Sequence, residues 1–250
     1  MSSTAIVMTG PLELLPRCIP THCWHLLRLL PPGDLIVSSL DDRHAGNASV
    51  LEQRLPGWRI LQHRLSDAQG WAARVRDWGL VPDAHSALDT LLPSPEAAEA
   101  VLGELWLRHQ AWQQLRLACP GTRHNKVIHM RTNLWMRAVD LPAKLAPQEA
   151  HTPWWGRQGG CNPGFALLGE QAAEAYFGVF RKLPELLRAG VPLHLPSLLF
   201  AALSSGDLRL RQTLRVEYTP IFPGKKIEET DISPLDLSTF LAEVAQGGVA

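Results

Sequence analysis

The sequence predicts a single α/β domain in which helices flank a mixed, mainly parallel β-sheet. Two short apolar runs, TAIVM at residues 4–8 and DLIVSSL at residues 34–40, have the length and composition of buried strands. Between them, apolar residues recur every three or four positions from residue 13 to residue 30, which predicts a helix. A strand, a helix and a second strand without a hairpin turn form a βαβ unit, and the two strands of such a unit are parallel.

The composition agrees with one globular domain. The chain has 250 residues, of which 46% are hydrophobic and 19% charged, enough for a sizeable core. Its 24 basic residues balance 24 acidic ones, so the charge indicates neither a nucleic-acid partner nor an anionic membrane. No apolar run approaches the ~20 residues of a membrane helix, and the N-terminus lacks a signal-peptide pattern. We therefore expect a cytoplasmic protein without a transmembrane segment.

The remaining elements follow from the same patterns. We predict strands at 57–65, Val127-Ile128, 165–168 and 208–218, and helices at 96–118, 169–187 and 191–204. Ser233 as a cap and Pro234 at the first position predict a C-terminal helix. We expect a domain at residues 1–232, on which the helix in residues 233–250 packs. That helix is open to three roles: a lid, a membrane-surface contact or the face of a homodimer.

The stretch from residue 126 to residue 169 carries the strongest functional signal. The polar run His129-Met130-Arg131-Thr132-Asn133 directly follows the apolar pair Val127-Ile128, and a glycine-rich loop with two tryptophans precedes the strand at 165–168. Polar side chains at the end of a buried strand, facing such a loop, are typical of a ligand site at the carboxyl edge of a sheet. We expect the other segments to support that site.

Several runs, in this order, carry a resemblance to a known family. They are AIVMTGPLELLPR, DLIVSSLDD, WLRHQAWQQLRLA, NKVIHMRTNLW and GGCNPGFALLGEQAAEAYFGVF, and together they cover roughly residues 4 to 205. In order and spacing they resemble a group of bacterial glycan-assembling glycosyltransferases. The resemblance implies a GT-A-like, Rossmann-like fold, a nucleotide-sugar donor, a glycan acceptor and a part in polysaccharide biosynthesis.

The first two motifs of that group match in part. Its first strand ends in a Ser-Gly-Gln-x-Arg-type turn, in which Gly10 matches the glycine and Arg17 lies near the arginine, displaced by an insertion. Gln110 matches a glutamine in the helix before the site. The resemblance therefore implies that Gly10, Arg17 and Gln110 bind the donor.

The other two motifs match with departures. The group's middle strand reads Val-Ile-Arg-x-Arg-x-Asp-Leu, in which Arg131 matches the second arginine and Asn133 stands at the aspartate. Its glycine-rich loop ends Asn-Asp-x-Phe-Ala, in which Asn162 and Phe165 match and Pro163 replaces the aspartate. The resemblance implies donor-binding roles for Arg131, Asn133, Asn162 and Phe165.

The departure at Asn133 bears on metal dependence. GT-A enzymes commonly neutralise the leaving diphosphate with Mg²⁺ or Mn²⁺ held by a carboxylate, and an amide is a much poorer ligand for these hard cations. Mn²⁺ or Mg²⁺ therefore remains an open alternative and not a firm expectation. We expect cationic side chains to take the place of the metal: Arg131, Arg17 and the pair Lys225-Lys226. If none of them reaches the phosphates, the alternative is a non-catalytic binding or scaffold protein. Lys225-Lys226 also fits a solvated loop, and Asn133 a strand-end turn.

Other candidates have two interpretations each. Adjacent indoles seldom both point inward, so one of Trp154 and Trp155 is a candidate stacking platform for a sugar or base, although both also fit a packed loop anchor. Gly159 belongs either to the binding loop or to a simple turn. Asp41 and Asp42, after the second strand, either hold a ribose hydroxyl or cap a turn.

Transfer of a sugar also requires a base for the proton of the acceptor hydroxyl. His194 lies near the place of a His-Pro-Glu-like element of the family, with Ser197 where the glutamate stands. Asp207 and Glu170 are the alternatives. A lone histidine beside an apolar run also fits a structural role.

Overall fold

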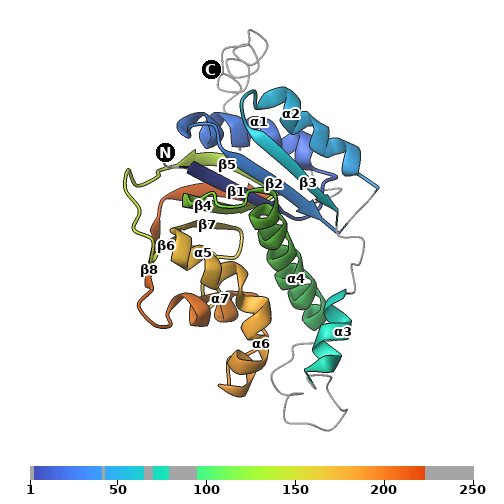
Figure 1. Ribbon diagram of the computed structural model, residues 1–250, viewed down its shortest axis with the longest axis vertical. Coiled ribbons are helices and arrows are strands. Elements are labelled where there is room, and N and C mark those ends of the chain that lie inside the picture. Colours follow the sequence, from blue (N-terminus) through green and yellow to red (C-terminus); the bar gives the residue numbers. More distant parts are fainter. Residues whose placement is uncertain (1–2, 41–42, 65–69, 79–94, 223–250) are drawn as a thin grey trace.

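The structure is a computed structural model that describes residues 3–40, 43–64, 70–78 and 95–222. A seven-stranded mixed sheet forms its centre (Figure 1). In spatial order the strands are β3 (Arg59–Arg64), β2 (Asp34–Ser39), β1 (Ser3–Thr9), β4 (His124–Arg131), β7 (Phe165–Leu168), β6 (Glu149–Pro153) and β8 (Arg209–Leu214). Among these strands only β7 runs against the others. The other six therefore end at one edge of the sheet, the carboxyl edge, and begin at the opposite amino edge.

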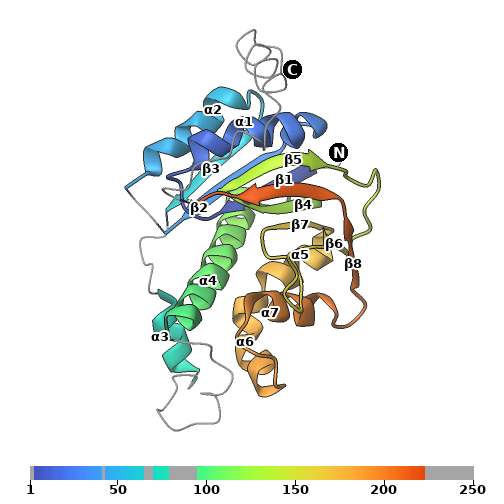
Figure 2. The ribbon, with the colours of Figure 1, turned by 180° about the vertical axis from the view of Figure 1, so that it is seen from behind.

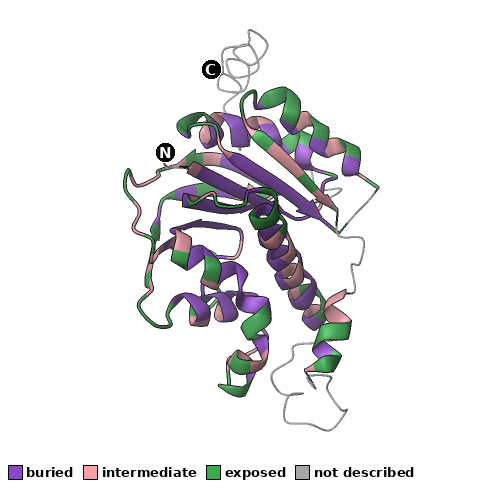
Figure 3. Cartoon of the chain, viewed as in Figure 1, coloured by how far each residue is buried: buried purple, intermediate pink, exposed green. Residues whose placement is uncertain are grey.

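Helices cover both faces of the sheet, as the sequence predicts. One face carries α4 (Pro95–Ala118), α5 (Glu170–Phe177), α6 (Val179–Arg188) and α7 (Leu195–Leu203), and the other carries α1 (Leu15–His25) and α2 (Ser49–Arg54). Alternate strand residues point to opposite faces, so Val7 packs with α4 and Ile6 with α1. Figure 3 shows the central strands as the most buried part of the chain.

The smaller elements complete the two layers. Helix α3 (Gly70–Asp77) packs on α4, and the 3₁₀ turns η1 (Leu27–Leu29) and η2 (Ala45–Ala48) lie beside α1. A second sheet pairs β5 (Leu134–Val139) with β9 (Val216–Pro220) in antiparallel register, and β5 contacts α1 (Figure 2). No helix in the described ranges has the length and apolar character needed to cross a membrane.

Two predicted elements differ from the observed ones. The helix predicted at 169–187 is two helices, α5 and α6, which meet at Gly178. A side chain at Gly178 would crowd the carbonyl of Glu174 at 2.5 Å, so this junction requires glycine. The strand predicted at 208–218 is also two strands, because the chain leaves the large sheet after β8 and joins the small one as β9.

Strands β5 and β6 were not predicted from the sequence. Their segments, LWMRAV and EAHTP, show neither alternation nor a long apolar run. Helix α3 lies where the pattern was only weakly helical. The C-terminal helix predicted within residues 233–250 falls outside the described residues.

Candidate functional site

The carboxyl edge places polar side chains of β1 and β4 on the face that α4 and α5 cover. Thr9, the last residue of β1, is paired in register with Arg131, the last residue of β4. His129 and Arg131 are two positions apart on β4, so their side chains share that face. Thr9 and His129 are fully buried, and Arg131 is partly buried. Buried polar groups need partners, and these come from the helices.

The partners form a closed circuit of hydrogen bonds, which we call the polar ring: Arg108, Tyr176, His129, Thr9 and Glu104. Arg108 Nη1 donates to the Tyr176 hydroxyl at 2.6 Å, and that hydroxyl lies 2.9 Å from His129 Nδ1. His129 Nε2 lies 3.0 Å from Thr9 Oγ1, which in turn donates to Glu104 at 3.4 Å. Arg108 closes the circuit with two bonds to Glu104, of 3.0 and 2.9 Å.

These bonds are consistent with a neutral His129. Since Arg108 only donates, the Tyr176 hydroxyl is free to donate to Nδ1, and the ring proton is then on Nε2, facing Thr9. Burial, together with the charges of Arg108 and Arg131, holds the pKa of His129 well below its usual range. The ring therefore contains one anion, Glu104, and one cation, Arg108.

Glu104 remains ionised beside the two arginines. Burial alone would raise the pKa of Glu104, but the charges of Arg108 and Arg131 and the bonds from Arg108 and Thr9 lower it overall. Counting Arg131 with the ring, two guanidinium groups face one carboxylate. Among these described residues, the positive charges therefore exceed the negative charges by one.

Arg131 carries this additional positive charge, and no hydrogen bond to a described residue holds its guanidinium in place. Its backbone amide donates to the carbonyl of Gly164 at 3.1 Å, but its guanidinium donates no hydrogen bond to any described residue. Its Nε is buried and unpaired. An unpaired, partly buried guanidinium at the carboxyl edge is suited to bind an anion such as a phosphate.

The loop at residues 154–164 borders Arg131 and is held by Asn162. The amide nitrogen of Asn162 donates to the carbonyl of Trp155 at 2.8 Å, and its oxygen accepts from the backbone of Gly164 and from Tyr218. Burial raises the pKa of Tyr218 to about 12, so this hydroxyl remains a donor. The loop is thereby attached to β9, which carries Tyr218.

The two tryptophans of this loop point in different directions, as expected for adjacent indoles. Trp155 turns inward, where its Nε1 donates to the carbonyl of Val216 at 2.8 Å and its ring lies 4.5 Å from that of Tyr218. Trp154 is 62% exposed. Gly159, with φ of +81°, and Gly156, with φ of +64°, take the left-handed conformation that favours glycine.

Two further predicted residues lie close to Arg131 in the chain or the sheet. Gly10 has φ of +128°, and a side chain there would lie 2.9 Å from Thr132 Oγ1, so glycine allows β1 and β4 to end side by side. Asn133 is buried, and its amide nitrogen donates to the carbonyl of Ile221 at 2.8 Å, while its oxygen has no partner among the described residues. Asn133 thus joins the large sheet to the segment after β9.

Other predicted binding residues lie elsewhere. Phe165 is fully buried in the core on the α1 face of the sheet, away from the polar ring. Arg17 is exposed on α1, which covers that same face. Gln110 lies six residues beyond Glu104 on α4, about 9 Å further toward the amino edge. Asp41, Asp42, Lys225 and Lys226 fall outside the described residues.

The three predicted bases are separated. Glu170 follows β7 and faces Arg123 at 3.4 Å, and the exposed Asp207 precedes β8, so both lie at the amino edge, across the sheet from Arg131. His194 caps α7 on the side of the 154–164 loop, and its Nδ1 lies 2.9 Å from Ser197 Oγ. The structure therefore brings only His194 of these three to the neighbourhood of that loop.

The described residues around Arg131 offer a divalent cation no free carboxylate. The described carboxylate at this edge, Glu104, is already bonded twice by Arg108, and Asn133 offers only a neutral amide oxygen. Two guanidinium groups in addition repel a metal ion. The described charges around Arg131 therefore suit an anion better than a cation.

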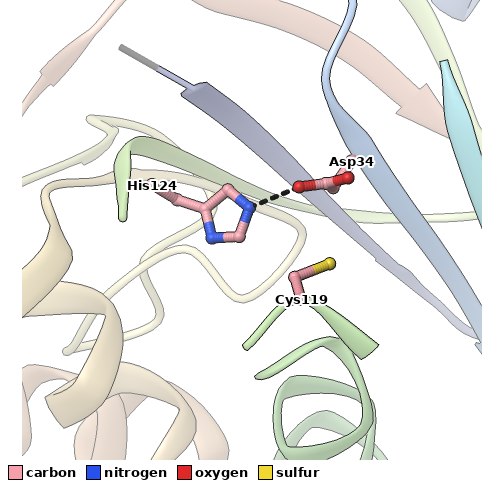
Figure 4. Close-up of side chains that lie close together, drawn as sticks. All are labelled: Asp34, Cys119 and His124. Atoms are coloured by element: carbon pink, nitrogen blue, oxygen red, sulfur yellow. Dashed lines mark hydrogen bonds and ion pairs between the residues drawn. The ribbon is translucent and has the colours of Figure 1, made fainter. Parts of the chain in front are cut away.

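A possible metal-binding group lies at the opposite, amino edge (Figure 4). Ligand atoms of Asp34, Cys119 and His124 lie within 4.8 Å of one another. Arg59 already occupies this group, since it donates to Asp34 at 2.6 Å and to the sulfur of Cys119 at 2.6 Å. His124 Nε2 completes the contact with Asp34 at 2.7 Å. The cluster thus has its own cation and fastens β2, β3, β4 and the end of α4 together.

Most residues of the polar ring were not predicted from the sequence. Glu104 and Arg108 are one helical turn apart, and His129 and Arg131 alternate on a strand, so both pairs carry a detectable spacing. The spacing does not show that the pair on α4 and the pair on β4 face each other in the folded chain. Tyr176 and Tyr218 carry no such signal.

The comparisons with known proteins gave structural neighbours but no sequence relatives. No protein-family model matches the sequence, and no curated protein matches it either. Mouse xyloside xylosyltransferase 1 is similar at 12% identity and a TM-score of 0.40, with 80% of each chain covered. The glycosyltransferase GlyE of Streptococcus pneumoniae TIGR4 is similar at 12% identity and a TM-score of 0.44, and 84% of this chain covers 45% of that one.

A third neighbour was solved with sugars bound. The galactosyltransferase LgtC, in complex with donor and acceptor sugar analogs, is similar at 11% identity and a TM-score of 0.43, with 82% of this chain and 72% of that chain covered. At these TM-scores the similarities by themselves assign no activity to the chain.

Proposed function

We propose that this chain is a glycosyltransferase that binds a nucleotide-sugar donor at Arg131 and transfers its sugar to a glycan or another acceptor without a metal ion. The observation that carries the proposal is the guanidinium of Arg131, which lies at the carboxyl edge beside the polar ring and donates no hydrogen bond to any described residue. The motifs that resemble glycan-assembling glycosyltransferases support it, since Arg131 matches an arginine of their middle strand.

The chemistry asks for a cation at this place. When the bond between the anomeric carbon and the diphosphate breaks, the bonding electrons leave with the diphosphate, whose negative charge must be stabilised. Arg131 would bind those oxygens with paired N–H groups, and Glu104 would keep the guanidinium oriented through its charge. The acceptor oxygen forms the new bond to the anomeric carbon, and its proton passes to a base.

His194 is the base that we propose. It lies at the N-terminus of α7, beside the 154–164 loop, whereas Glu170 and Asp207 lie across the sheet. Its contact with Ser197 Oγ holds one ring nitrogen and leaves the other to accept a proton. Loss of this base would lower kcat rather than the affinity for the donor.

Nucleotide binding tests the proposal directly. We expect uridine, guanosine or cytidine diphosphate to raise the melting temperature equally with Mn²⁺ and with EDTA. Arg131→Ala should weaken that binding about tenfold or more, because a charge-assisted pair contributes about 1.5–3 kcal/mol. The fold should remain intact, since the Arg131 guanidinium makes no hydrogen bond to the described residues.

Arg123→Ala is the matched control, because it removes the same charge at an 82% exposed position of the amino edge. Equal affinity in Arg131→Ala and Arg123→Ala would exclude Arg131 from the site. Binding that requires Mn²⁺ would contradict the metal-free part of the proposal.

The second candidate is a non-catalytic binding protein. The observation that favours it is the amide of Asn133 in the place of the family's carboxylate, together with the distance of Glu170 and Asp207 from Arg131. Hydrolysis or transfer of any sugar nucleotide that survives EDTA and is lost in His194→Gln would decide for the enzyme. Nucleotide binding without turnover of any donor would decide for the binding protein.

A further inference from the structure

A recess lies between the 154–164 loop, α7 and β8, and we call it the aromatic groove. Its volume is about 510 Å³, within the range of small-molecule sites. Its walls are Trp154, Arg157, Gln158 and Gly160 from the loop, Phe200 from α7 and Gln212 from β8. None of these residues belongs to the polar ring, so the groove is a separate site.

Two of its walls are aromatic side chains that folding leaves in water. Trp154 is 62% exposed and Phe200 is 42% exposed, although both are large and apolar. The neighbouring Trp155, in contrast, packs against Tyr218. The fold therefore buries one indole of this loop and leaves the other, that of Trp154, in contact with solvent. Exposed aromatic residues that line a recess are typical of ligand-binding grooves, where each provides a flat apolar platform.

The polar groups of the groove are held in place before any ligand binds. Gln212 Nε2 donates to the carbonyl of Gly160 at 2.7 Å, and its oxygen accepts from Arg157 Nη1 at 3.0 Å. Gln158 has φ of +46°, a conformation that non-glycine residues rarely adopt, so the loop backbone is specified in detail. Amide and guanidinium groups in fixed positions suit hydroxyl-rich ligands.

The charge of the groove narrows the class of ligand. Arg157 is its charged side chain, and its described lining residues include no carboxylate. A cationic ligand is therefore disfavoured. A flat platform beside donors and acceptors of hydrogen bonds matches a sugar ring, which has apolar C–H faces and a rim of hydroxyl groups.

We propose that the aromatic groove binds a saccharide, with a pyranose ring stacked on Trp154 and its hydroxyl groups bonded by Gln158 and Arg157. Its assignment as the acceptor site rests on the proposed glycosyltransferase function. The same loop contacts Arg131 at its other end, where the carbonyl of Gly164 accepts from the Arg131 amide. The loop thus connects Arg131 with the groove, and the groove also lies against Phe200 of α7, the helix whose N-cap is His194.

Saturation-transfer NMR on the full chain tests saccharide binding without any nucleotide. The probes are tetrasaccharides of glucose, mannose, galactose and N-acetylglucosamine and one uronic-acid tetramer. We expect at least one to bind, and we expect Trp154→Ala to weaken it about tenfold, with Trp154→Phe restoring most of the affinity because the ring is kept. Leu117→Ala is the control, since it removes a 71% exposed side chain at the far end of α4.

The outcomes separate this inference from the proposed function. Saccharide binding that depends on Trp154 and survives Arg131→Ala supports the groove as a site of its own. Nucleotide binding at Arg131 with no probe bound, or with binding that Trp154→Ala leaves unchanged, overturns the groove and leaves the proposed function standing. Saccharide binding at Trp154 without nucleotide binding by any form of the chain overturns the acceptor role.

Discussion

At the scale of single residues, the Tyr176 hydroxyl connects the two halves of the polar ring. It accepts from Arg108 and donates to His129, both of which are buried. Burial raises the pKa of Tyr176, so the hydroxyl stays protonated. Its removal would leave a buried guanidinium N–H and a buried imidazole nitrogen without partners.

Tyr176→Phe should therefore lower the free energy of unfolding by about 1–3 kcal/mol, the cost of leaving buried polar groups unsatisfied. Tyr218→Phe is the matched control, because the oxygen of Asn162 keeps its bond from Gly164 when the Tyr218 hydroxyl is gone. Urea denaturation of both variants measures the difference. Equal losses of unfolding free energy in the two variants would mean that the Tyr176 hydroxyl stabilises the fold no more than the single hydrogen bond of Tyr218 does.

At the scale of elements, the 154–164 loop lies in backbone contact with α7. The amide of Cys161 donates to the carbonyl of Pro196 at 2.9 Å, and a side chain at Gly160 would overlap that same carbonyl. The neighbouring Gly159 has φ of +81° but open space around it. Adjacent glycines thus serve two separate needs, one for close approach and one for backbone conformation.

This difference predicts unequal effects of the same substitution. Gly160→Ala should force the loop away from α7 and cost about 1–3 kcal/mol or more, the range of overpacking. Gly159→Ala should cost about 1 kcal/mol from its left-handed backbone alone. Hydrogen exchange of the Cys161 amide provides a local measurement, with faster exchange expected in Gly160→Ala only. Equal exchange in the two variants would argue against the contact with α7.

At the scale of the whole molecule, buried neutral histidines couple folding to pH. Burial lowers the pKa of His22 to about 4, although its bond to the carbonyl of Leu134 acts in the opposite direction. Burial also lowers the pKa of His129. As the pH falls below ~6.5, the unfolded chain binds these protons and the folded chain does not, so stability is lost.

His22→Gln should make this loss shallower. Between about pH 7 and about pH 5, removal of one such histidine should reduce the total change in the free energy of unfolding by about 2 kcal/mol. The interval lies above the range in which the lowered pKa values of Asp34 and Glu104 begin to matter. Denaturant titrations at several pH values give the slope for each protein. An unchanged slope would show that His22 is protonated in the folded state or exposed to water.

The 154–164 loop was predicted in part from its sequence. That one of two adjacent indoles must face solvent follows from the alternating direction of neighbouring side chains, and the structure shows Trp154 as the exposed one. Which of the two it is depends on Tyr218 and Val216, about sixty residues further along the chain. Gly159 was predicted as a residue of a turn or binding loop, whereas the close approach that requires Gly160 was not predicted.

The sequence by itself determined the α/β class, the parallel start of the sheet and the position of Arg131 at the end of a buried strand, because apolar spacing and the polar exit of a strand are local properties. Only the tertiary structure decided that β7 runs antiparallel, that Glu170 and Asp207 lie across the sheet and that Phe165 packs in the core. The same holds for the polar ring, whose members lie on β1, α4, β4 and α5. Their meeting depends on how helices cross the sheet, and that packing is a property of the whole chain, which local spacing does not encode.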